Sequence, residues 1–177
     1  MAKKPAESKK NTETDASEQS AAAPRFHIQA QYVKDMSFES PQSPAAFIGQ
    51  AENPQLDVAV NVAGEKLDDT HYEVVLKVKA TAKNEKGVLF DLELDYGGVA
   101  FISDVPEDNI NALVMIEGPR LMFPFARQVV SNITREGGFL PLNLNPINFA
   151  ALYRQNMEAQ AGAGNGADNG DILAETV

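Results

Sequence analysis

The chain has 177 residues, a formal net charge of −10 at pH 7 and no cysteine. This length suffices for one domain with a hydrophobic core, and the lack of cysteine excludes disulfides, thiolate catalysis and cysteine-ligated zinc. No apolar run is long enough to span a membrane, so we expect no membrane insertion. Residues 24–114 carry seven basic residues against fifteen acidic ones. Such a surface repels phosphate backbones, so we expect no nucleic-acid partner and consider a basic protein segment a more natural one.

Both ends of the chain are poor in large apolar side chains. Residues 1–23 are mainly Lys, Glu, Ser, Thr and Ala, and residues 161–177 begin with AGAGNGADNG. Such segments bury too little surface to offset the entropy lost on ordering. We therefore predict a disordered arm at 1–23, one folded domain at 24–160 and a flexible acidic tail at 161–177.

Four segments in the first half alternate between apolar and polar side chains, namely 26–38, 56–62, 72–80 and 88–96. In the first segment the expected buried face consists of even-numbered residues, with Val33 as an exception: Phe26, Ile28, Ala30, Tyr32, Met36 and Phe38. A period of two is typical of strands with one buried face. Turn residues separate the segments, which predicts a four-stranded antiparallel sheet.

The second half changes to helical spacing. Residues 107–117 follow Pro106 with two acidic residues, as helix starts often do, and we expect this helix to stop at Gly118-Pro119. Residues 121–133 form a second helical stretch, and Asn148 is a suitable cap for a last helix at 149–160. The prediction is an α+β domain in which the sheet is followed by a long broken helix, an apolar loop and a short C-terminal helix.

The search for catalytic or metal chemistry is negative. The two histidines have no zinc-ligand spacing, and no nucleotide-binding glycine pattern occurs. Asp91, Glu93 and Asp95 alternate along an expected exposed face, where carboxylates stay solvated. Gly97-Gly98 is interpreted as a strand bulge or a close backbone approach. We expect no enzyme activity, no metal and no cofactor.

Two surfaces are more apolar than one small sheet requires. The helical stretch 121–133 has a long apolar face, which favours oligomerisation through helices. The segment GGFLPLNLNPINF, residues 137–149, is loop-like in its Gly, Pro and Asn content yet rich in Leu, Ile and Phe. Either this loop fills the core of its own chain, or it offers an apolar surface to a partner.

Five segments together resemble the SecB family of bacterial protein-export chaperones: YVKDMSFESPQSP, YEVVLKVKATA, YGGVAFI, LMFPFAR and PLNLNPINFAALY. The resemblance runs in unbroken order over about residues 24–160. It implies a homotetramer built as a dimer of dimers, with no enzyme activity and no cofactor. It further implies an ATP-independent holdase in the cytoplasm that keeps precursors unfolded and passes them to the translocase motor SecA, whose basic, zinc-bearing C-terminal tail is the docking segment.

The resemblance also implies site residues. A client groove is expected at Leu56, Val58, Val60, Phe139, Leu142, Leu144, Phe149 and Leu152, one wall being the loop at 137–149, the family's crossover loop. A SecA-binding surface is expected at Asp35, Glu39, Asp91 and Glu93, although the family usually has an apolar residue where Asp91 stands. The oligomer interface is expected on the long helix at Leu121, Met122, Phe125, Val129, Val130 and Ile133.

Two alternatives remain. One is a SecB-like chaperone dedicated to a single client, such as a toxin–antitoxin pair, against which Asp35, Glu39 and Glu93 argue, because it would not need the motor site. The other is a protein that binds a small apolar ligand, against which the lack of converging polar residues argues.

Overall fold

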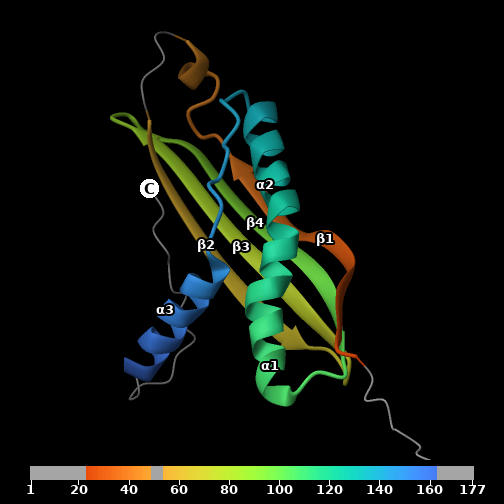
Figure 1. The fold of residues 1–177 in the computed structure, drawn as a ribbon. Helices are drawn as coiled ribbons and strands as arrows, with labels where there is room; N and C mark the ends of the chain where they lie inside the picture. The colour runs from red at the N-terminus through yellow and green to blue at the C-terminus, as the bar shows by residue number, and fades with distance from the viewer. Residues whose placement is uncertain (1–22, 49–53, 163–177) are drawn as a thin grey trace, which may run out of the picture.

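Four long strands form one antiparallel sheet in the computed structural model, which describes residues 23–48 and 54–162 (Figure 1). The strands are β1 (Arg25–Glu39), β2 (Gln55–Lys66), β3 (His71–Asn84) and β4 (Gly87–Ser103), and a short 3-10 turn, η1 (Ala45–Phe47), lies between β1 and β2. Their order in the sheet is β1-β4-β3-β2, so β1 and β2 are its two edges. The predicted four-stranded antiparallel sheet is confirmed. The predicted arm and acidic tail fall outside the described residues, apart from residues 23, 161 and 162.

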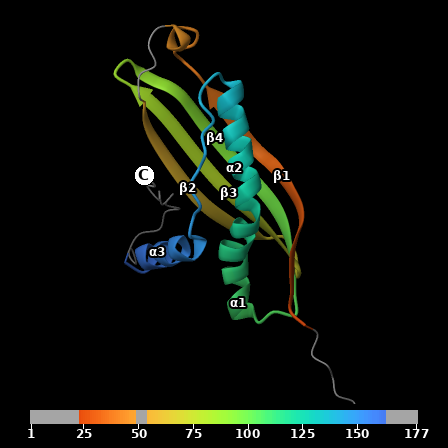
Figure 2. The same cartoon turned by 45° about the horizontal axis from the view of Figure 1, so that its top comes forward.

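The helices lie on one face of this sheet (Figures 1 and 2). They are α1 (Glu107–Ala112), the π-helical turn η2 (Leu113–Glu117), α2 (Gly118–Glu136) and α3 (Phe149–Gly162). The crossover loop runs from the end of α2 back along the sheet to α3, which lies on the β2 side (Figure 2). The sheet therefore has an inner face, under the helices and loop, and an outer face that carries no described helix.

The core fills the space between the inner face and α2. Alternate side chains of β3 and β4 point into it and are almost fully buried, as are three side chains of α2: Val74, Leu76, Val78, Ala80, Leu92, Leu94, Met122, Ala126 and Val130. The period-two pattern of the strands and the helical spacing of α2 thus meet in one apolar layer.

The structure corrects the predicted face of β1 in its middle. The pairing of β1 with β4 shifts register between Ile28 and Ala30 and again between Val33 and Asp35. Each shift is a β-bulge, which adds one residue to β1 and reverses the faces of the residues beyond it. Ala30 and Tyr32 were predicted on the buried face, but they lie on the outer face, while Val33, the exception in the sequence pattern, lies on the inner side opposite Tyr96.

The two adjacent glycines of β4 serve opposite faces of the sheet. A Cβ atom on Gly97 would lie 2.6 Å from the Tyr32 ring, on the outer face. A Cβ atom on Gly98 would lie 2.8 Å from the sulfur of Met122, on the inner face. Close packing therefore requires both glycines, in agreement with the interpretation from the sequence.

The long helix does not stop at Gly118-Pro119, contrary to the prediction. Helical residues run without interruption from Glu107 to Glu136. Proline has no N–H to donate, and η2 accommodates this by widening the helix: the N–H of Gly118 donates to the carbonyl of Leu113, five residues earlier. Pro119 directly follows this wider turn inside the continuous helix, which runs on past it.

Candidate functional site

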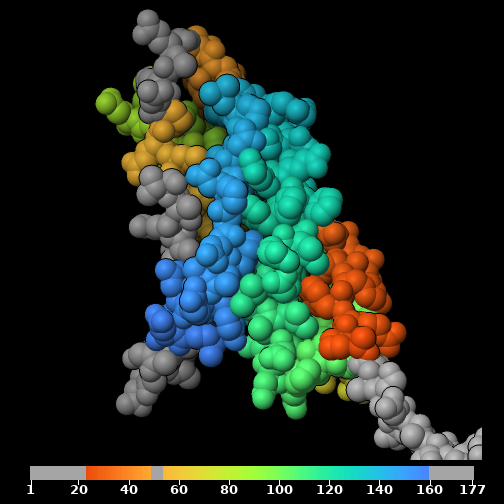
Figure 3. Space-filling model, in the orientation of Figure 1, coloured from red at the N-terminus to blue at the C-terminus, as the bar shows by residue number. Residues whose placement is uncertain are grey.

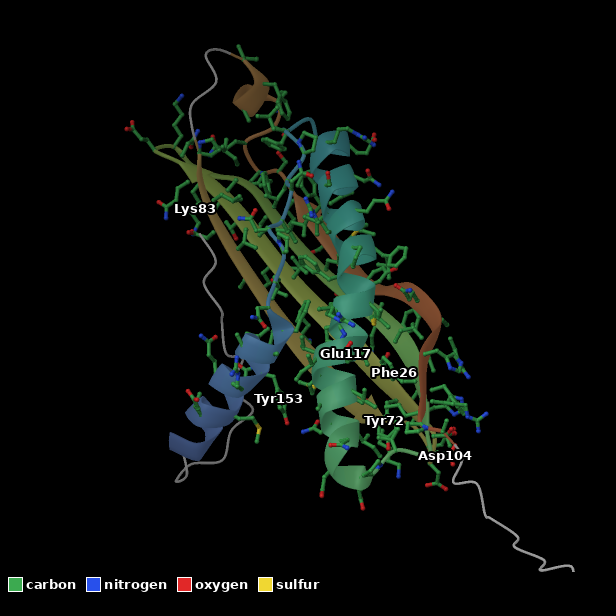
Figure 4. All side chains as sticks on the ribbon, viewed as in Figure 1. Phe26, Tyr72, Lys83, Asp104, Glu117 and Tyr153 are labelled. Atoms are coloured by element: carbon green, nitrogen blue, oxygen red, sulfur yellow. The ribbon has the colours of Figure 1, made fainter. Side chains whose placement is uncertain are left out.

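An apolar groove of about 650 Å³ lies on the inner face, where the crossover loop crosses one end of the sheet. Figure 4 labels Lys83 at this end, and Tyr72 and Asp104 at the opposite end. The walls come from η1, from the start of β2 with the preceding Pro54, and from the loop, and the floor comes from β3 and β4. The apolar side chains of this lining are those of Ala46, Phe47, Ile48, Pro54, Leu56, Ala82, Leu89, Phe90, Phe139, Leu140 and Leu142. Apolar side chains dominate this lining, as they do in binding sites for apolar partners.

Four phenylalanines hold the closed side of the groove in position. The ring of Phe139 lies 5.1 Å from that of Phe90, 5.2 Å from that of Phe47 and 6.3 Å from that of Phe38. Gly138 has a φ of +86°, and a Cβ there would lie 3.0 Å from the Phe47 ring, so glycine permits this contact. Ring contacts at these distances are favourable beyond the area they bury, so the cluster stabilises this wall of the groove.

The crossover loop is anchored by a buried threonine. The Oγ1 of Thr134, on α2, accepts a hydrogen bond of 2.9 Å from the N–H of Leu142 and donates one of 3.0 Å to the carbonyl of Val130. Thr134 is fully buried. Removing a buried partner of this kind leaves unsatisfied groups, so the loop's course depends on this residue. Figure 3 shows the loop in blue lying directly against α2.

The loop contributes to the core of its own chain and also leaves apolar surface exposed. Leu144 is buried in the core, whereas Leu140 is 90% exposed beside the groove. Of the predicted groove residues, the structure brings together Leu56, Phe139 and Leu142 around the groove. Val58 is half-buried near them. The other four are buried in the core and do not line this groove: Val60, Leu144, Phe149 and Leu152.

Several groove residues lie outside the predicted set. Phe90 belongs to the apolar face of its strand, but alternation alone does not assign it to the groove. Phe47 follows two prolines in a turn and is 50% exposed. The signal was the same as for the crossover loop, namely large apolar side chains in a segment with loop composition.

The outer face carries the four acidic residues of the predicted SecA-binding surface. Glu39 pairs with Asp91, and Ser37 pairs with Glu93, so these side chains lie together where β1 meets β4. Asp91 accepts a hydrogen bond of 2.6 Å from Thr81, which turns it toward β3. In the ranges that the structure describes, Asp35 and Glu39 form no ion pair, so their charges are open to a partner.

A row of lysines on β3 borders this acidic surface, and the sequence analysis did not include it. Lys77 lies 3.3 Å from Asp95, and Lys79 lies 3.1 Å from Glu93. Both lysines share the odd-numbered outer face of their strand, so the alternation itself contained the signal. The outer face is therefore acidic at the β1 edge and nearly balanced toward β3. Exposed ion pairs such as these contribute little to stability. Because they neutralise Asp95 and Glu93, the carboxylates without an ion pair lie mainly at the β1 edge of the sheet.

Glu73, Tyr32 and Lys34 form a polar cluster that ties β1 to β3 across β4. The Tyr32 hydroxyl donates to one oxygen of the buried Glu73 carboxylate, and the Lys34 ammonium donates to the other at 2.6 Å. The bonds from Lys34 and Tyr32 lower the pKa of Glu73. The bond to Glu73, together with burial, raises the pKa of Tyr32 to about 12. The first bulge makes this cluster possible, because it turns Tyr32 to the outer face.

The predicted oligomer interface needs correction at two positions on α2. Met122 and Val130 are completely buried against their own sheet, so they are unavailable to a partner. Val129 and Ile133 are half-buried against the core. Leu121 and Phe125 are 45% and 50% exposed, on the side of the helix that points away from the sheet.

Within the described residues, no group of three or more His, Asp or Glu side chains is arranged to hold a metal ion. None of the helices there is both long and apolar enough to cross a membrane.

Replacement of Glu73 by Gln should return the pKa of Tyr32 from about 12 toward its ordinary value of 10.0, since the carboxylate is the main cause of the shift. A pH titration of tyrosinate absorbance measures this, with Tyr32→Phe identifying the relevant transition. Because folding raises the pKa of Tyr32, the neutral hydroxyl should contribute fully to the free energy of unfolding below pH 10.0. This contribution should disappear toward pH 12, as the hydroxyl ionises.

The same cluster should make the stability of the protein depend on pH in acid. Glu73 has a pKa below its ordinary 4.5, so its carboxylate should contribute fully to the free energy of unfolding above pH 4.5. This contribution should disappear as the pH falls further and the carboxylate is protonated. The gap in unfolding free energy between the parent chain and Glu73→Gln should therefore narrow in acid. The exposed turn residue Glu85, changed to Gln, is the matched control and should show no gap. If the parent chain and Glu73→Gln differ in unfolding free energy by the same amount at every pH, the charge of Glu73 does not stabilise the fold.

Comparisons with known proteins agree with this geometry. The family model described as preprotein translocase subunit SecB matches residues 19–160. The chain is similar to the protein-export protein SecB of Rhodopseudomonas palustris strain BisB18, with 47% identity over 150 residues, 85% of this chain and 92% of the relative. It is also similar to the protein-export protein SecB of Nitrobacter winogradskyi, with 49% identity over 145 residues, 82% of this chain and 91% of the relative.

A solved structure shares the fold. It is the Mycobacterium tuberculosis Rv1957 SecB-like chaperone in complex with a ChAD peptide from the Rv1956 HigA1 antitoxin, with a TM-score of 0.58 and 15% identity, covering 70% of this chain and 91% of that one. At this identity the likeness concerns the fold alone. Taken with the family model and the relatives above, the sheet, the long helix and the crossover loop lead to one assignment: the chain belongs to the SecB family of protein-export chaperones.

Proposed function

We propose that this chain is an ATP-independent holdase that keeps precursor proteins unfolded in the cytoplasm and delivers them to the translocase motor SecA. The observation that carries this proposal is the open apolar groove of about 650 Å³ beneath an anchored crossover loop. A groove lined by Leu56, Phe47 and Leu142, with Leu140 at its rim, buries apolar side chains of any shape. The gain is about 25 cal/mol per Å² of apolar surface removed from water and needs no particular client sequence.

The alternative of a dedicated client has one observation in its favour. The fold-sharing mycobacterial chaperone was solved with an antitoxin peptide bound. However, that protein is 15% identical to this chain, whereas the two protein-export relatives are 47% and 49% identical. General export is therefore the better-supported function.

The acidic edge of the outer face is the proposed docking surface for SecA. Asp35 and Glu39 have no competing ion pair among the described residues, and a short basic segment complements them. The zinc carried by the motor's tail belongs to that partner. Since this surface and the groove lie on opposite faces of one sheet, the motor has access while the groove holds a client.

We further propose that the exposed side of α2 joins two dimers into a tetramer. Leu121 and Phe125 are large apolar side chains that the chain itself leaves half-exposed. Beside them, a hollow of about 540 Å³ between α2 and the loop combines Phe123, Ile147 and Phe149 with polar and basic side chains, among them Arg120, Arg127 and Asn143. A partner helix can place both apolar and polar side chains there, as two-fold interfaces commonly do.

Serine at both Leu56 and Leu140 should weaken client binding about tenfold or more, because burying one leucine side chain is worth about 1.5–3 kcal/mol. Binding of an unfolded, reduced and alkylated protein, measured by calorimetry, checks this. Leu67→Ser is the matched control, since Leu67 is 52% exposed but does not line the groove. Unchanged client affinity in the double variant would remove the groove from the function.

Alanine at both Asp35 and Glu39 should weaken binding of the motor's tail about tenfold, since each exposed ion pair contributes up to about 1 kcal/mol. Client binding should be unchanged. Surface plasmon resonance with a synthetic tail peptide and zinc measures the first quantity. Asp57→Ala is the control, because Asp57 lies on β2 and pairs with Lys83 instead. Loss of both activities together would contradict separate surfaces.

Replacing Phe125 with Asp should dissociate the tetramer into dimers at low protein concentration, because a charge cannot be buried between helices without a partner. Light scattering on a sizing column gives the mass. Circular dichroism should be unchanged, since Phe125 is 50% exposed within its own chain. A tetramer that survives the substitution would exclude this face of α2 from the interface.

A further inference from the structure

The two bulges of β1 decide which of its side chains reach the outer face. The first and last residues of the strand place odd-numbered side chains on that face, whereas the stretch between the bulges places even-numbered ones there. The second bulge, at Lys34, therefore restores the pattern that the first bulge reversed. The face that Asp35 occupies depends on where this second bulge lies along the strand.

A bulge placed two residues later would turn Asp35 inward. Asp35 lies on the outer face because Lys34, the residue before it, is the extra residue of the bulge. If the pairing continued from Val33 without a break, Asp35 would lie opposite Leu94, whose side chain is buried in the core. A small change in the position of the bulge thus removes one carboxylate from the acidic edge.

Glu39, the other acidic residue of β1, has a separate anchor. The ring of the preceding residue, Phe38, stacks on that of Phe90 with the ring centres 5.7 Å apart. Successive side chains of a strand point to opposite faces, so this inner contact holds Glu39 outward. Asp35 has no comparable neighbour, because the next residue, Met36, is 42% exposed. The direction of Asp35 therefore needs another support.

A polar cluster on the outer face supplies this support. Glu73 of β3 accepts hydrogen bonds from the hydroxyl of Tyr32, which precedes the bulge, and from the ammonium of Lys34, which forms it. Both side chains reach across β4, where Gly97 leaves room for the Tyr32 ring. The cluster thus connects the residues around the bulge to a fixed point on a central strand.

Moving the bulge would separate Glu73 from its counterion. In the uninterrupted register Lys34 would lie directly opposite Asp95 instead of reaching back to Glu73. Asp95 already pairs with Lys77 at 3.3 Å. Lys34, by contrast, is the one cation that pairs with Glu73 in the part of the chain that the structure describes. A buried carboxylate without its partner is strongly destabilising, so Glu73 favours the register in which Asp35 points outward.

We propose that Glu73 is a positioning residue for motor docking: through Tyr32 and Lys34 it fixes the second bulge of β1 and so turns Asp35 toward the partner. This rests on the proposed docking of SecA at the acidic edge and identifies the residue that orients that edge. Glu73 does not contact the partner itself, because it is buried and both of its carboxylate oxygens accept bonds within the chain. Its influence reaches the docking surface through the backbone of β1.

Binding of the zinc-loaded synthetic tail peptide to four full-length variants, measured by surface plasmon resonance, tests this. Tyr32→Phe changes no charge and should weaken binding about threefold, the factor for one exposed ion pair. Lys34→Gln should weaken it as much, although losing a positive charge from this face would by itself strengthen binding of a basic peptide. Lys34→Arg keeps a donor for Glu73 and should bind like the parent. The matched control Lys79→Gln removes the same charge from β3, where Lys79 pairs with Glu93, and should not weaken binding.

Four results would overturn the inference. If Lys34→Gln binds the peptide more tightly than the parent, Lys34 acts through its charge alone. If Tyr32→Phe and Lys34→Gln lose client binding or oligomer mass as much as peptide binding, the cluster only stabilises the fold. If Asp35→Ala with Glu39→Ala leaves peptide binding unchanged, the proposed docking surface itself fails. If that double variant weakens peptide binding and Tyr32→Phe does not, the docking surface stands and the positioning role alone is excluded.

Discussion

The close approach of α2 to the inner face of the sheet is the contact on which the rest of the structure depends. Met122 of the helix lies over Gly98 of β4, and a Cβ atom on Gly118 of the helix would lie 3.0 Å from the Val74 side chain of β3. A glycine on the sheet and a glycine on the helix therefore let the two approach closely. Because the helix covers only part of the inner face, the remaining apolar surface must be covered by something else. The crossover loop covers some of it, and what it leaves open is the groove. The proposed binding surface is thus the part of the apolar inner face that the helix and the loop leave uncovered.

The loop can leave apolar side chains in water because other residues hold it. Thr134 fixes its backbone from α2, and Leu144 anchors it in the core. These contacts allow Leu140 to remain 90% exposed without the loop collapsing onto the sheet. A loop held only by its own apolar side chains would close the groove, since burying Leu140 would be favourable by about 1.5–3 kcal/mol. Polar anchoring therefore keeps an apolar surface accessible.

Alternation predicted four strands and their buried faces well, because a strand with one face in water has to alternate. It failed at Ala30 and Tyr32, since a bulge changes the faces without changing composition, and only Val33 and the paired glycines hinted at it. Helical spacing identified the apolar residues of α2 but could not tell Met122, which faces its own sheet, from Phe125, which faces outward. The groove was only partly predictable, because Phe47, Leu56 and Phe139 meet through tertiary contacts that local patterns do not encode.

The two proposed binding surfaces are built from adjacent residues of the same strands. Phe38 and Phe90 belong to the aromatic wall on the inner face, and the next residues, Glu39 and Asp91, form the acidic pair on the outer face. Successive side chains of a strand point to opposite faces, so the backbone that positions one surface also positions the other. The sheet is one layer thick at this point, so neither surface can be altered in position without the other.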